Sequence, residues 1–206
     1  MSYLIVGASS GLGRELAYEF AKNKKNLILT SRDTRDLGAI KNDLENLYNV
    51  DVEIIELNLS DLNNVTKFVN AFDSHNLNGL IFSAGMIYDD DSVLTDKDKY
   101  IELFNANFLS ISFIVSNLAL KNPEKKLSII GFGSVSGLLG RKFNTYYAAS
   151  KRALHSYFES LGLSNIGGNK LQFYILGYLN TNLAFGKKLI LPKGKTSNLA
   201  KKVFKW

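Results

Sequence analysis

The sequence predicts one doubly wound α/β domain over residues 1–206, with a parallel sheet in the strand order 3-2-1-4-5-6. Short apolar runs alternate with longer segments of helical period, as expected for parallel strands joined by crossover helices. The runs are nearly continuous in apolar character, which indicates strands covered on both faces. A glycine-rich turn follows the first run and leads directly into a helical pattern.

Six apolar runs are predicted as strands: Ser2 to Val6, Asn26 to Thr30, Val52 to Leu57, Gly79 to Ser83, Leu127 to Gly133 and Leu171 to Leu176. Three helices are predicted from apolar residues at three- and four-residue spacing, namely Leu12, Leu16, Phe20; Leu37, Ile40, Leu44, Leu47; and Leu62, Val65, Phe68, Val69, Phe72. A longer fourth helix carries Ile101, Phe104, Phe108, Ile111, Val115 and Leu118. A fifth is expected from about Thr145 to Gly162.

The composition is that of an ordinary soluble protein, with 46% hydrophobic and 21% charged residues. The chain has no cysteine and only His75 and His155, so we expect no disulfide framework and no bound metal. The uncharged run Leu103 to Leu120 approaches membrane-spanning length, but its Asn and Ser side chains favour a buried helix. The chain starts with a strand and turn instead of a cationic, apolar leader, and we therefore expect a cytoplasmic protein.

Charge is unevenly distributed along the chain. Residues 1–120 hold 10 Lys and Arg against 17 Asp and Glu, whereas residues 121–206 hold 15 against 2. A basic half suits an anionic ligand, a phosphate-rich cofactor or an acidic membrane surface, although a merely solvated lysine surface explains it equally well. Its basic residues show no aromatic-interleaved repeat or helix-turn-helix pattern, so we expect no nucleic-acid binding.

The turn after the first strand reads Gly7-Ala8-Ser9-Ser10-Gly11-Leu12-Gly13. Gly7 is expected to permit the sharp exit from the strand, Gly11 to let a pyrophosphate approach the backbone, and Gly13 to allow close packing of helix on strand. The start of the following helix supplies unpaired N–H groups and partial positive charge. We therefore interpret the segment as a dinucleotide-binding turn, with an ordinary tight turn as the alternative.

Ser31 and Arg32 follow the second strand, where a site for NAD usually offers a carboxylate to the ribose 2′-hydroxyl. A guanidinium there can clamp the 2′-phosphate of NADP and stack on adenine. The alternative is a surface Arg32 that pairs with Asp33 or Asp36. We expect NADP(H) to be preferred over NAD(H).

The segment Tyr147-Ala148-Ala149-Ser150-Lys151 places a phenol and an ammonium four residues apart, on one face of a helix. An adjacent ammonium lowers the pKa of a phenol, so Tyr147 becomes a usable general acid or base. Tyr146 has no lysine at that spacing, and we expect it to pack or to form a substrate wall. Ser134, at the end of the fifth strand, can donate to a carbonyl oxygen beside the tyrosine.

These motifs together resemble the short-chain dehydrogenase/reductase superfamily over nearly the whole chain. The matching residues are Gly7, Gly11, Gly13, Ser83-Ala84-Gly85, Asn107, Ser134, Tyr147, Lys151 and Gly177-Tyr178-Leu179-Asn180-Thr181. The resemblance implies hydride transfer between NADP(H) and a small carbonyl or alcohol substrate. The basic second half of the chain would suit an anionic substrate. It also implies that Tyr147 protonates the developing alkoxide, that Lys151 holds the nicotinamide ribose, and that Asn107 anchors a water joining Lys151 to solvent.

The cofactor-contacting residues that the resemblance implies are Gly7, Ser9, Ser10, Gly11, Leu12, Gly13, Ser31, Arg32, Asn58, Leu59, Ser83, Ala84, Gly85, Tyr147, Lys151, Gly177 and Thr181. Three positions depart from the family pattern. Ser83 stands in place of Asn, Asn58 in place of an acidic residue, and Leu176 in place of proline. Asn58 can still hydrogen-bond an adenine amino group.

The end of the chain departs most from the family pattern, which adds a seventh strand after a helix. Residues 196–206 are expected to form that helix, and the seventh strand is expected to be absent. We expect 183–195 to be a substrate-lid loop, because the apolar Leu189 to Pro192 lies between lysines. The alternative is a patch that rests weakly on an anionic membrane.

The fourth helix has the apolar spacing that family members use to pair across a two-fold axis, so we expect a homodimer. The same seam would also serve to cover the sheet of a monomer. Two alternative functions are a catalytically silent dinucleotide-binding sensor or regulatory protein and a membrane-surface-associated protein that uses the basic C-terminal tail. The intact set of Asn107, Ser134, Tyr147 and Lys151 argues against a silent protein.

Overall fold

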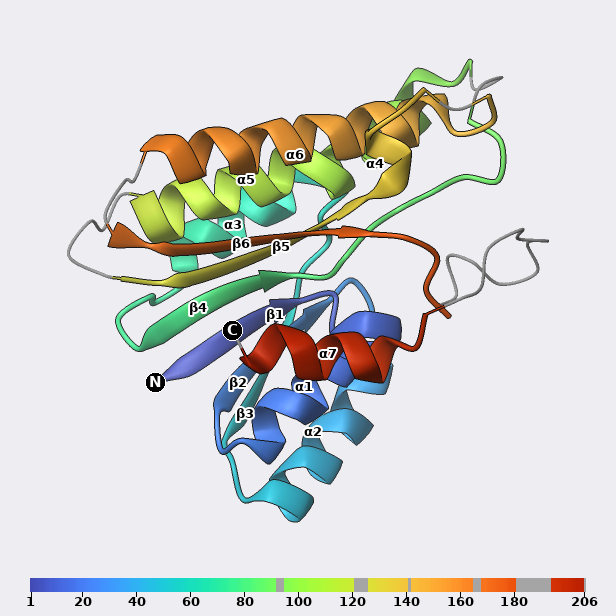
Figure 1. Ribbon diagram of the computed structural model, residues 1–206. Coiled ribbons are helices and arrows are strands. Elements are labelled where there is room, and N and C mark those ends of the chain that lie inside the picture. Colours follow the sequence, from blue (N-terminus) through green and yellow to red (C-terminus); the bar gives the residue numbers. More distant parts are fainter. Residues whose placement is uncertain (92–94, 121–125, 141, 165–167, 181–193, 206) are drawn as a thin grey trace. The chain divides into compact units, whose positions relative to one another are not determined.

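The computed structural model describes residues 1–91, 95–120, 126–140, 142–164, 168–180 and 194–205. Its strands alternate with helices along the chain (Figure 1). The strands are β1 (Ser2–Val6), β2 (Asn26–Ser31), β3 (Val52–Glu56), β4 (Leu77–Phe82), β5 (Ser128–Ser134) and β6 (Lys170–Leu176). The sheet has the predicted order β3-β2-β1-β4-β5-β6, and the pairings of β1 with β2 and β4, of β2 with β3, and of β5 with β6 are parallel. The predicted doubly wound α/β fold is confirmed.

The helices are α1 (Gly11–Lys22), α2 (Arg35–Tyr48), α3 (Leu62–Ala71), α4 (Lys97–Phe104), α5 (Ser110–Val115), α6 (Thr145–Ser164) and α7 (Thr196–Lys205). Two π-helical segments, η1 (Asn105–Leu109) and η2 (Ser116–Leu120), and a short 3₁₀ turn, η3 (Val135–Gly137), complete the described elements. β1 has the predicted bounds, and the other five strands differ from the predicted ones by one or two residues at one or both ends, because apolar runs do not mark where hydrogen bonding stops.

The chain divides into two compact units. Unit 1 comprises Met1–Leu57, Asn76–Ala84 and Gly177–Trp206, and it contains β1 to β4 with α1, α2 and α7. Unit 2 comprises Asn58–His75 and Gly85–Leu176, and it contains β5, β6 and the remaining helices. The two units are described separately below.

Unit 1 is built on a sheet of fully buried aliphatic residues such as Leu4, Leu29 and Leu80. Helix α7 lies beside α1 (Figure 1). The ring of Phe20 on α1 packs edge-on against Phe204 of α7, with centroids 4.9 Å apart, and against Tyr3 of β1 at the same distance. The last described helix is therefore part of the core of unit 1.

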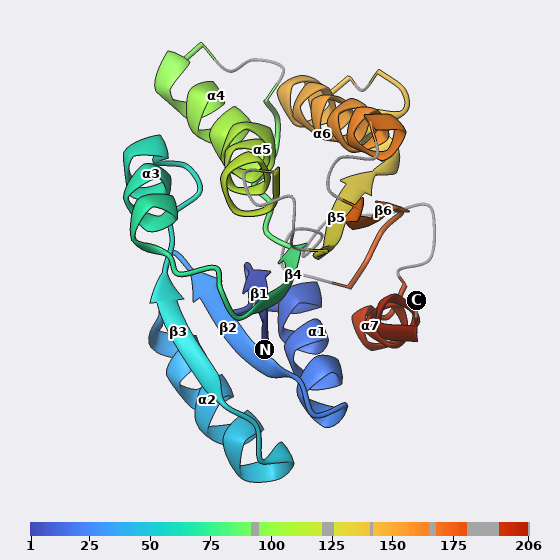
Figure 2. The ribbon, with the colours of Figure 1, turned by 90° about the vertical axis from the view of Figure 1, so that its left-hand side faces the viewer.

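In unit 2, helix α6 lies along α4 and α5 and covers β5 and β6 (Figures 1 and 2). A ring contact joins α6 to β6, because Phe158 packs on Phe173 with centroids 4.9 Å apart. The same ring packs on β5, because a Cβ at Gly131 would lie 2.6 Å from it, so the ring fills the space that a side chain at Gly131 would need. This close packing fixes the helix that carries two of the predicted catalytic residues.

The predicted fourth helix is one continuous helical stretch, Lys97–Leu120, but it is not regular. Its turn widens in η1, where the N–H of Ser110 donates to the carbonyl of Asn105, five residues back. The widened turn shifts the apolar face. Ile111 is fully buried as expected, whereas Ile101 is 47% exposed, so the predicted 3-4 seam does not form one buried face. The homodimer stays a prediction.

By length and composition alone, Lys97–Leu120 is apolar enough to cross a membrane, with a mean hydropathy of 1.5 over an 18-residue window. In the structure 56% of that window is buried inside the protein. Two of its polar side chains bind the loop after β3: the hydroxyl of Ser110 donates to the carbonyl of Leu59, and the amide of Asn105 donates to the carbonyl of Ser60. We interpret the stretch as a core helix.

Candidate functional site

The glycine turn of unit 1 brings the ends of β1 and β4 against the start of α1. Gly7 has a φ of +91°, and a Cβ on it would lie 2.7 Å from the backbone of Ala84. A Cβ on Gly13 would lie 2.1 Å from the carbonyl oxygen of Gly7. The packing roles predicted for these two glycines are confirmed. Ser83, which replaces the family asparagine, donates its hydroxyl to the carbonyl of Val6 at 2.9 Å.

The start of α1 presents backbone N–H groups that no side chain caps. Ser10 is the N-cap residue, yet its hydroxyl makes no capping hydrogen bond, and the first turn carries no acidic residue. The guanidinium of Arg14 donates to the carbonyl of Ser9 at 3.1 Å and 2.6 Å, which fixes the turn from the helix side. Uncapped N–H groups and a positive helix terminus fit the pyrophosphate of a dinucleotide.

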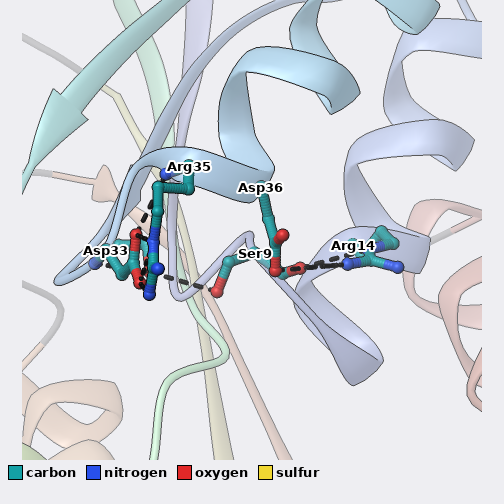
Figure 3. A network of polar contacts seen from close by, with 6 residues as sticks. Ser9, Arg14, Asp33, Arg35 and Asp36 are labelled. Carbon is teal, nitrogen blue, oxygen red and sulfur yellow. Dashed lines mark hydrogen bonds and ion pairs between the residues drawn. The ribbon is translucent and has the colours of Figure 1, made fainter.

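Two serines join the glycine turn to the end of β2. The hydroxyl of Ser31 donates to that of Ser9 at 3.0 Å, and Ser31 is only 8% exposed. Beyond Ser31 the chain carries a local ion pair, in which Arg35 Nε donates to both carboxylate oxygens of Asp33 at 3.0 Å and 2.9 Å (Figure 3). Arg35 lowers the pKa of Asp33 to about 2.

Arg32 lies exposed at this place and forms no ion pair with any residue of the described ranges. The sequence analysis left open whether Arg32 pairs with Asp33 or Asp36. Asp33 instead binds Arg35, and Asp36 lies 3.9 Å from Arg14 (Figure 3). Both carboxylates near Arg32 therefore have other cationic partners.

Asn58 and Leu59 belong to unit 2, in the loop after β3. The side-chain oxygen of Asn58 accepts from the N–H of Ser60 at 3.1 Å, and its backbone N–H donates to the side chain of Asn64. The carbonyl of Leu59 accepts from the hydroxyl of Ser110 at 2.6 Å. The π-helical region thus holds this loop, a contact that the sequence analysis did not predict.

The side chain of Ser134 lies close enough to the phenol of Tyr147 to influence its pKa. The hydrogen bond that we expect from Ser134 to a substrate carbonyl oxygen stays a prediction. Ser134 ends β5, and its oxygen accepts from the N–H of Ser136 at 3.1 Å. Burial raises the pKa of Tyr147, and the side chain of Ser134 lowers it in part. We expected the pKa of Tyr147 to lie below its ordinary value because of Lys151. In the ligand-free protein it lies above that value, because burial outweighs the lowering effect.

Lys151 lies one turn after Tyr147 on α6 and is 6% exposed. Its ammonium donates to the carbonyl of Phe132 on β5 at 3.3 Å. Burial lowers the pKa of Lys151 from 10.5 to about 8. An ammonium held in so dry a place lowers the stability of the folded protein when its partner is a neutral carbonyl.

Asn107 is fully buried in η1. Its side-chain oxygen accepts from the N–H of Met86 at 2.8 Å, and its amide donates to the carbonyl of Met86 at 2.8 Å and to the hydroxyl of Ser150 at 3.1 Å. Asn107 therefore links the loop after β4 to α6. The water that the family resemblance implied at this residue stays a prediction.

The sequence analysis missed Asp91, a fully buried carboxylate of the loop after β4. Its oxygens accept from the backbone N–H groups of Tyr146 at 3.0 Å and Tyr147 at 2.7 Å. Tyr146 itself stacks on Tyr100 with ring centroids 5.3 Å apart, which is the packing role we predicted. The only signal in the sequence is the run of three aspartates at 89–91. Nothing in that run indicates that Asp91, and not Asp89 or Asp90, is the buried one.

The structure says less about the remaining residues that were predicted to contact the cofactor or the substrate. Gly85 belongs to unit 2 and Gly177 to unit 1. Thr181 and most of the predicted lid, 183–193, lie outside the described residues, and α7 occupies 196–205 of the range expected as a helix. Within the ranges that the structure describes, no three His, Cys, Asp or Glu side chains gather in a way that could hold a metal ion.

A family model described as short chain dehydrogenase matches residues 2–183. Among curated proteins, the chain is 27% identical over 215 residues to 11-beta-hydroxysteroid dehydrogenase-like 2 of Arabidopsis thaliana, covering 98% of this chain and 68% of that protein. It is 29% identical over 163 residues to the NADP-dependent 3-hydroxy acid dehydrogenase of Schizosaccharomyces pombe, covering 77% and 63%.

Two solved structures share the fold. A short-chain dehydrogenase from Sphingobium yanoikuyae in complex with NADPH matches with a TM-score of 0.89 at 23% identity, covering 98% of this chain and 82% of that one. A bulky-bulky ketone specific alcohol dehydrogenase from Comamonas testosteroni matches with a TM-score of 0.89 at 22% identity, covering 98% and 80%.

The buried ammonium of Lys151 generates a prediction about stability. The ammonium of Lys151 has a pKa near 10.5 in the unfolded chain and of about 8 in the folded, cofactor-free protein. The cost of burying the charge is therefore present in full below pH 8 and disappears as the pH rises through 10.5. We predict that Lys151→Met raises the free energy of unfolding at pH 7 by about 1–3 kcal/mol.

Urea unfolding of the cofactor-free protein measures this difference, which should shrink between pH 8 and pH 10. The control is Lys99→Met, an exposed lysine of α4, for which we expect no such pH dependence. A Lys151→Met protein that is less stable than the wild type at pH 7 would contradict the interpretation of Lys151 as a strained, functional cation.

Proposed function

Because the chain belongs to the short chain dehydrogenase family and is an oxidoreductase of that family, we propose that it transfers a hydride between NADP(H) and a small carbonyl or alcohol substrate, with Tyr147 as general acid and base. The observation that carries this proposal is the buried ammonium of Lys151, which donates to a carbonyl of β5 at 3.3 Å one turn after Tyr147, with Ser134 at the end of the same strand. Phenol, hydroxyl and ammonium are the groups that a carbonyl reduction needs.

The nicotinamide cofactor supplies the hydride when it is bound, or accepts it in the reverse reaction. In reduction, the hydroxyl of Ser134 donates a hydrogen bond to the carbonyl oxygen of the substrate and stabilises the negative charge that develops there. Tyr147 gives its phenolic proton to the same oxygen, so that its O–H bond breaks as the O–H bond of the product alcohol forms. In oxidation the phenolate takes the proton back.

Lys151 serves the phenolate that Tyr147 becomes after proton donation. Its ammonium lies on the same face of α6 as the phenol, and a positive charge there stabilises a phenolate more than a phenol. Burial lowers the pKa of Lys151 to about 8, so the residue still carries its charge at neutral pH. Asn107 supports this arrangement, because it binds the hydroxyl of Ser150, the residue before Lys151.

The glycine turn of unit 1 suits the phosphates of the cofactor. The uncapped N–H groups at the start of α1 can donate to a pyrophosphate, and the absence of a Cβ at Gly7 and Gly13 keeps the turn tight. Ser9 and Ser31 supply hydroxyls beside this turn. We further propose that Asn58 and Leu59 contact the adenine.

The proposal predicts that Tyr147→Phe abolishes turnover and retains NADPH binding, because the phenol donates the proton whereas the ring packing survives. We expect a loss of at least about a thousandfold in kcat, measured by NADPH absorbance with a panel of carbonyl compounds. The matched control is Tyr146→Phe, which keeps its stacking on Tyr100 and should change kcat by less than about twofold. A Tyr146→Phe protein that is more damaged than Tyr147→Phe would contradict the assignment.

The charges after β2 support a preference for NADP(H). Arg32 is exposed and forms no ion pair with a described residue, and the nearby carboxylate of Asp33 is neutralised by Arg35. A free guanidinium beside a compensated carboxylate attracts a 2′-phosphate. The Schizosaccharomyces pombe relative is described as NADP-dependent, and the Sphingobium yanoikuyae structure holds NADPH.

We predict that NADPH binds more tightly than NADH by roughly 1–3 kcal/mol, and that Arg32→Ala removes most of this difference while leaving the affinity for NADH unchanged. Calorimetric titration of the wild type and of Arg32→Ala with NADPH and with NADH measures the four dissociation constants. Lys41→Ala, which removes a partly exposed cation of α2 that pairs with Glu45, controls for the loss of one positive charge. Equal dissociation constants of the wild type for the two cofactors would overturn the preference.

A further inference from the structure

Asp91 is the only buried carboxylate among the described residues, and its exposed fraction is 0%. Each of its two oxygens accepts one backbone N–H of the first turn of α6: Oδ1 from Tyr146 at 3.0 Å and Oδ2 from Tyr147 at 2.7 Å. Its own N–H donates to the carbonyl of Phe143, just before the helix, at 3.0 Å. Asp91 thus caps α6 from a segment more than fifty residues earlier in the chain.

The loop that carries Asp91 also binds the other polar residues around the candidate catalytic site. Met86 exchanges two hydrogen bonds of 2.8 Å with the side chain of Asn107. The carbonyl of Tyr88 accepts from the side chain of Asn144, one residue before α6, at 3.3 Å. The segment from Met86 to Asp91 therefore holds Asn107 at one end and the start of α6 at the other.

We propose that Asp91 is a positioning residue for the proposed reaction, which fixes the first turn of α6 and thereby holds the phenol of Tyr147 against Ser134. This inference rests on the proposed function of Tyr147. The residue does not touch the substrate. It acts through the backbone of the tyrosine, whose own N–H it binds.

The chemistry of a carboxylate explains why this position carries Asp. Two diverging N–H groups need two acceptors, and both oxygens of a carboxylate accept. The positive end of the α6 dipole also favours a negative charge at this place. An asparagine has nearly the same shape, yet one of its two terminal groups is an NH₂ donor, which would face a backbone N–H. Asp91→Asn therefore breaks one of the two bonds with little change in side-chain volume.

A loosened first turn would let the phenol move relative to Ser134, and misplacement of a catalytic group by about 1 Å can cost about a hundredfold in rate. We therefore expect Asp91→Asn to lower kcat by about tenfold and Asp91→Ala by about a hundredfold. The dissociation constant for NADPH should change by less than about threefold, because the glycine turn belongs to unit 1 and Asp91 to unit 2. Both variants are assayed well below their melting temperatures, with kcat normalised to folded protein.

The matched control is Asp96→Asn. Asp96 caps α4 by accepting from the N–H of Asp98 at 3.0 Å, and it lies eleven residues before Asn107, the member of the proposed catalytic set in the helical stretch that α4 begins. This variant loses a helix cap of the same kind, so its melting temperature should fall, whereas its kcat should stay within about twofold of the wild type. If the role of Asp91 were purely structural, Asp91→Asn and Asp96→Asn would both lower the melting temperature and leave kcat unchanged.

A second readout does not need turnover. Tyrosine labelled with ¹³C at Cζ gives one resonance per ring, and the resonance of Tyr147 is the one absent from Tyr147→Phe. Because its shift reports the hydrogen bond of the phenol, Asp91→Asn should move it in the same direction as Ser134→Ala does. The resonance of Tyr3, in unit 1, serves as the internal reference.

The outcomes separate this inference from the proposed function. A wild type that turns over, together with an Asp91→Asn protein of unchanged kcat and unchanged Tyr147 resonance, overturns the role of Asp91 alone. A wild type without turnover on any carbonyl overturns the proposed function, and the Tyr147 resonance then decides whether Asp91 positions the phenol. A lowered kcat with a shifted resonance supports both.

Discussion

The close packing of α6 on β5 is the constraint on which the candidate catalytic site depends. Gly131 allows the ring of Phe158 to approach the strand, where a Cβ would lie 2.6 Å from that ring. Because the helix lies so close, the ammonium of Lys151 reaches the carbonyl of Phe132 on the same strand. The phenol of Tyr147 likewise reaches Ser134 at the end of that strand. A helix held further away would carry the same residues without bringing them to the strand.

This arrangement buries polar groups that would be destabilising without partners, and unit 2 supplies partners for those of the candidate site. Asn107 and Ser150 bind each other, Asp91 binds two N–H groups of α6, and Lys151 binds a carbonyl. The ammonium of Lys151 has a neutral carbonyl as its partner, and burial lowers its pKa to about 8. We infer that burying this cation lowers the stability of the ligand-free protein.

The sequence predicted those features that local pattern determines. Apolar runs identified the strands, and the doubly wound fold class that they indicate implied their order. Spacing selected Tyr147 over Tyr146 because only Tyr147 has a lysine four residues later. The sequence did not predict Asp91, whose partners lie more than fifty residues away, nor the partner of Asp33, because Arg32 and Arg35 are both near it in the chain. It also missed the widened turn of η1, where polar contacts of the helix with a distant loop accompany the shift in register.

Transfer of isotope from the cofactor tests the central claim most directly. NADPH deuterated at the transferable position of its nicotinamide C4 is incubated with the protein and a panel of carbonyl compounds, and the products are analysed by mass spectrometry and chiral chromatography. We predict an alcohol that carries one deuterium at the carbinol carbon, in a single configuration. Tight binding of NADPH without label in any product would contradict the account and favour a catalytically silent nucleotide-binding protein.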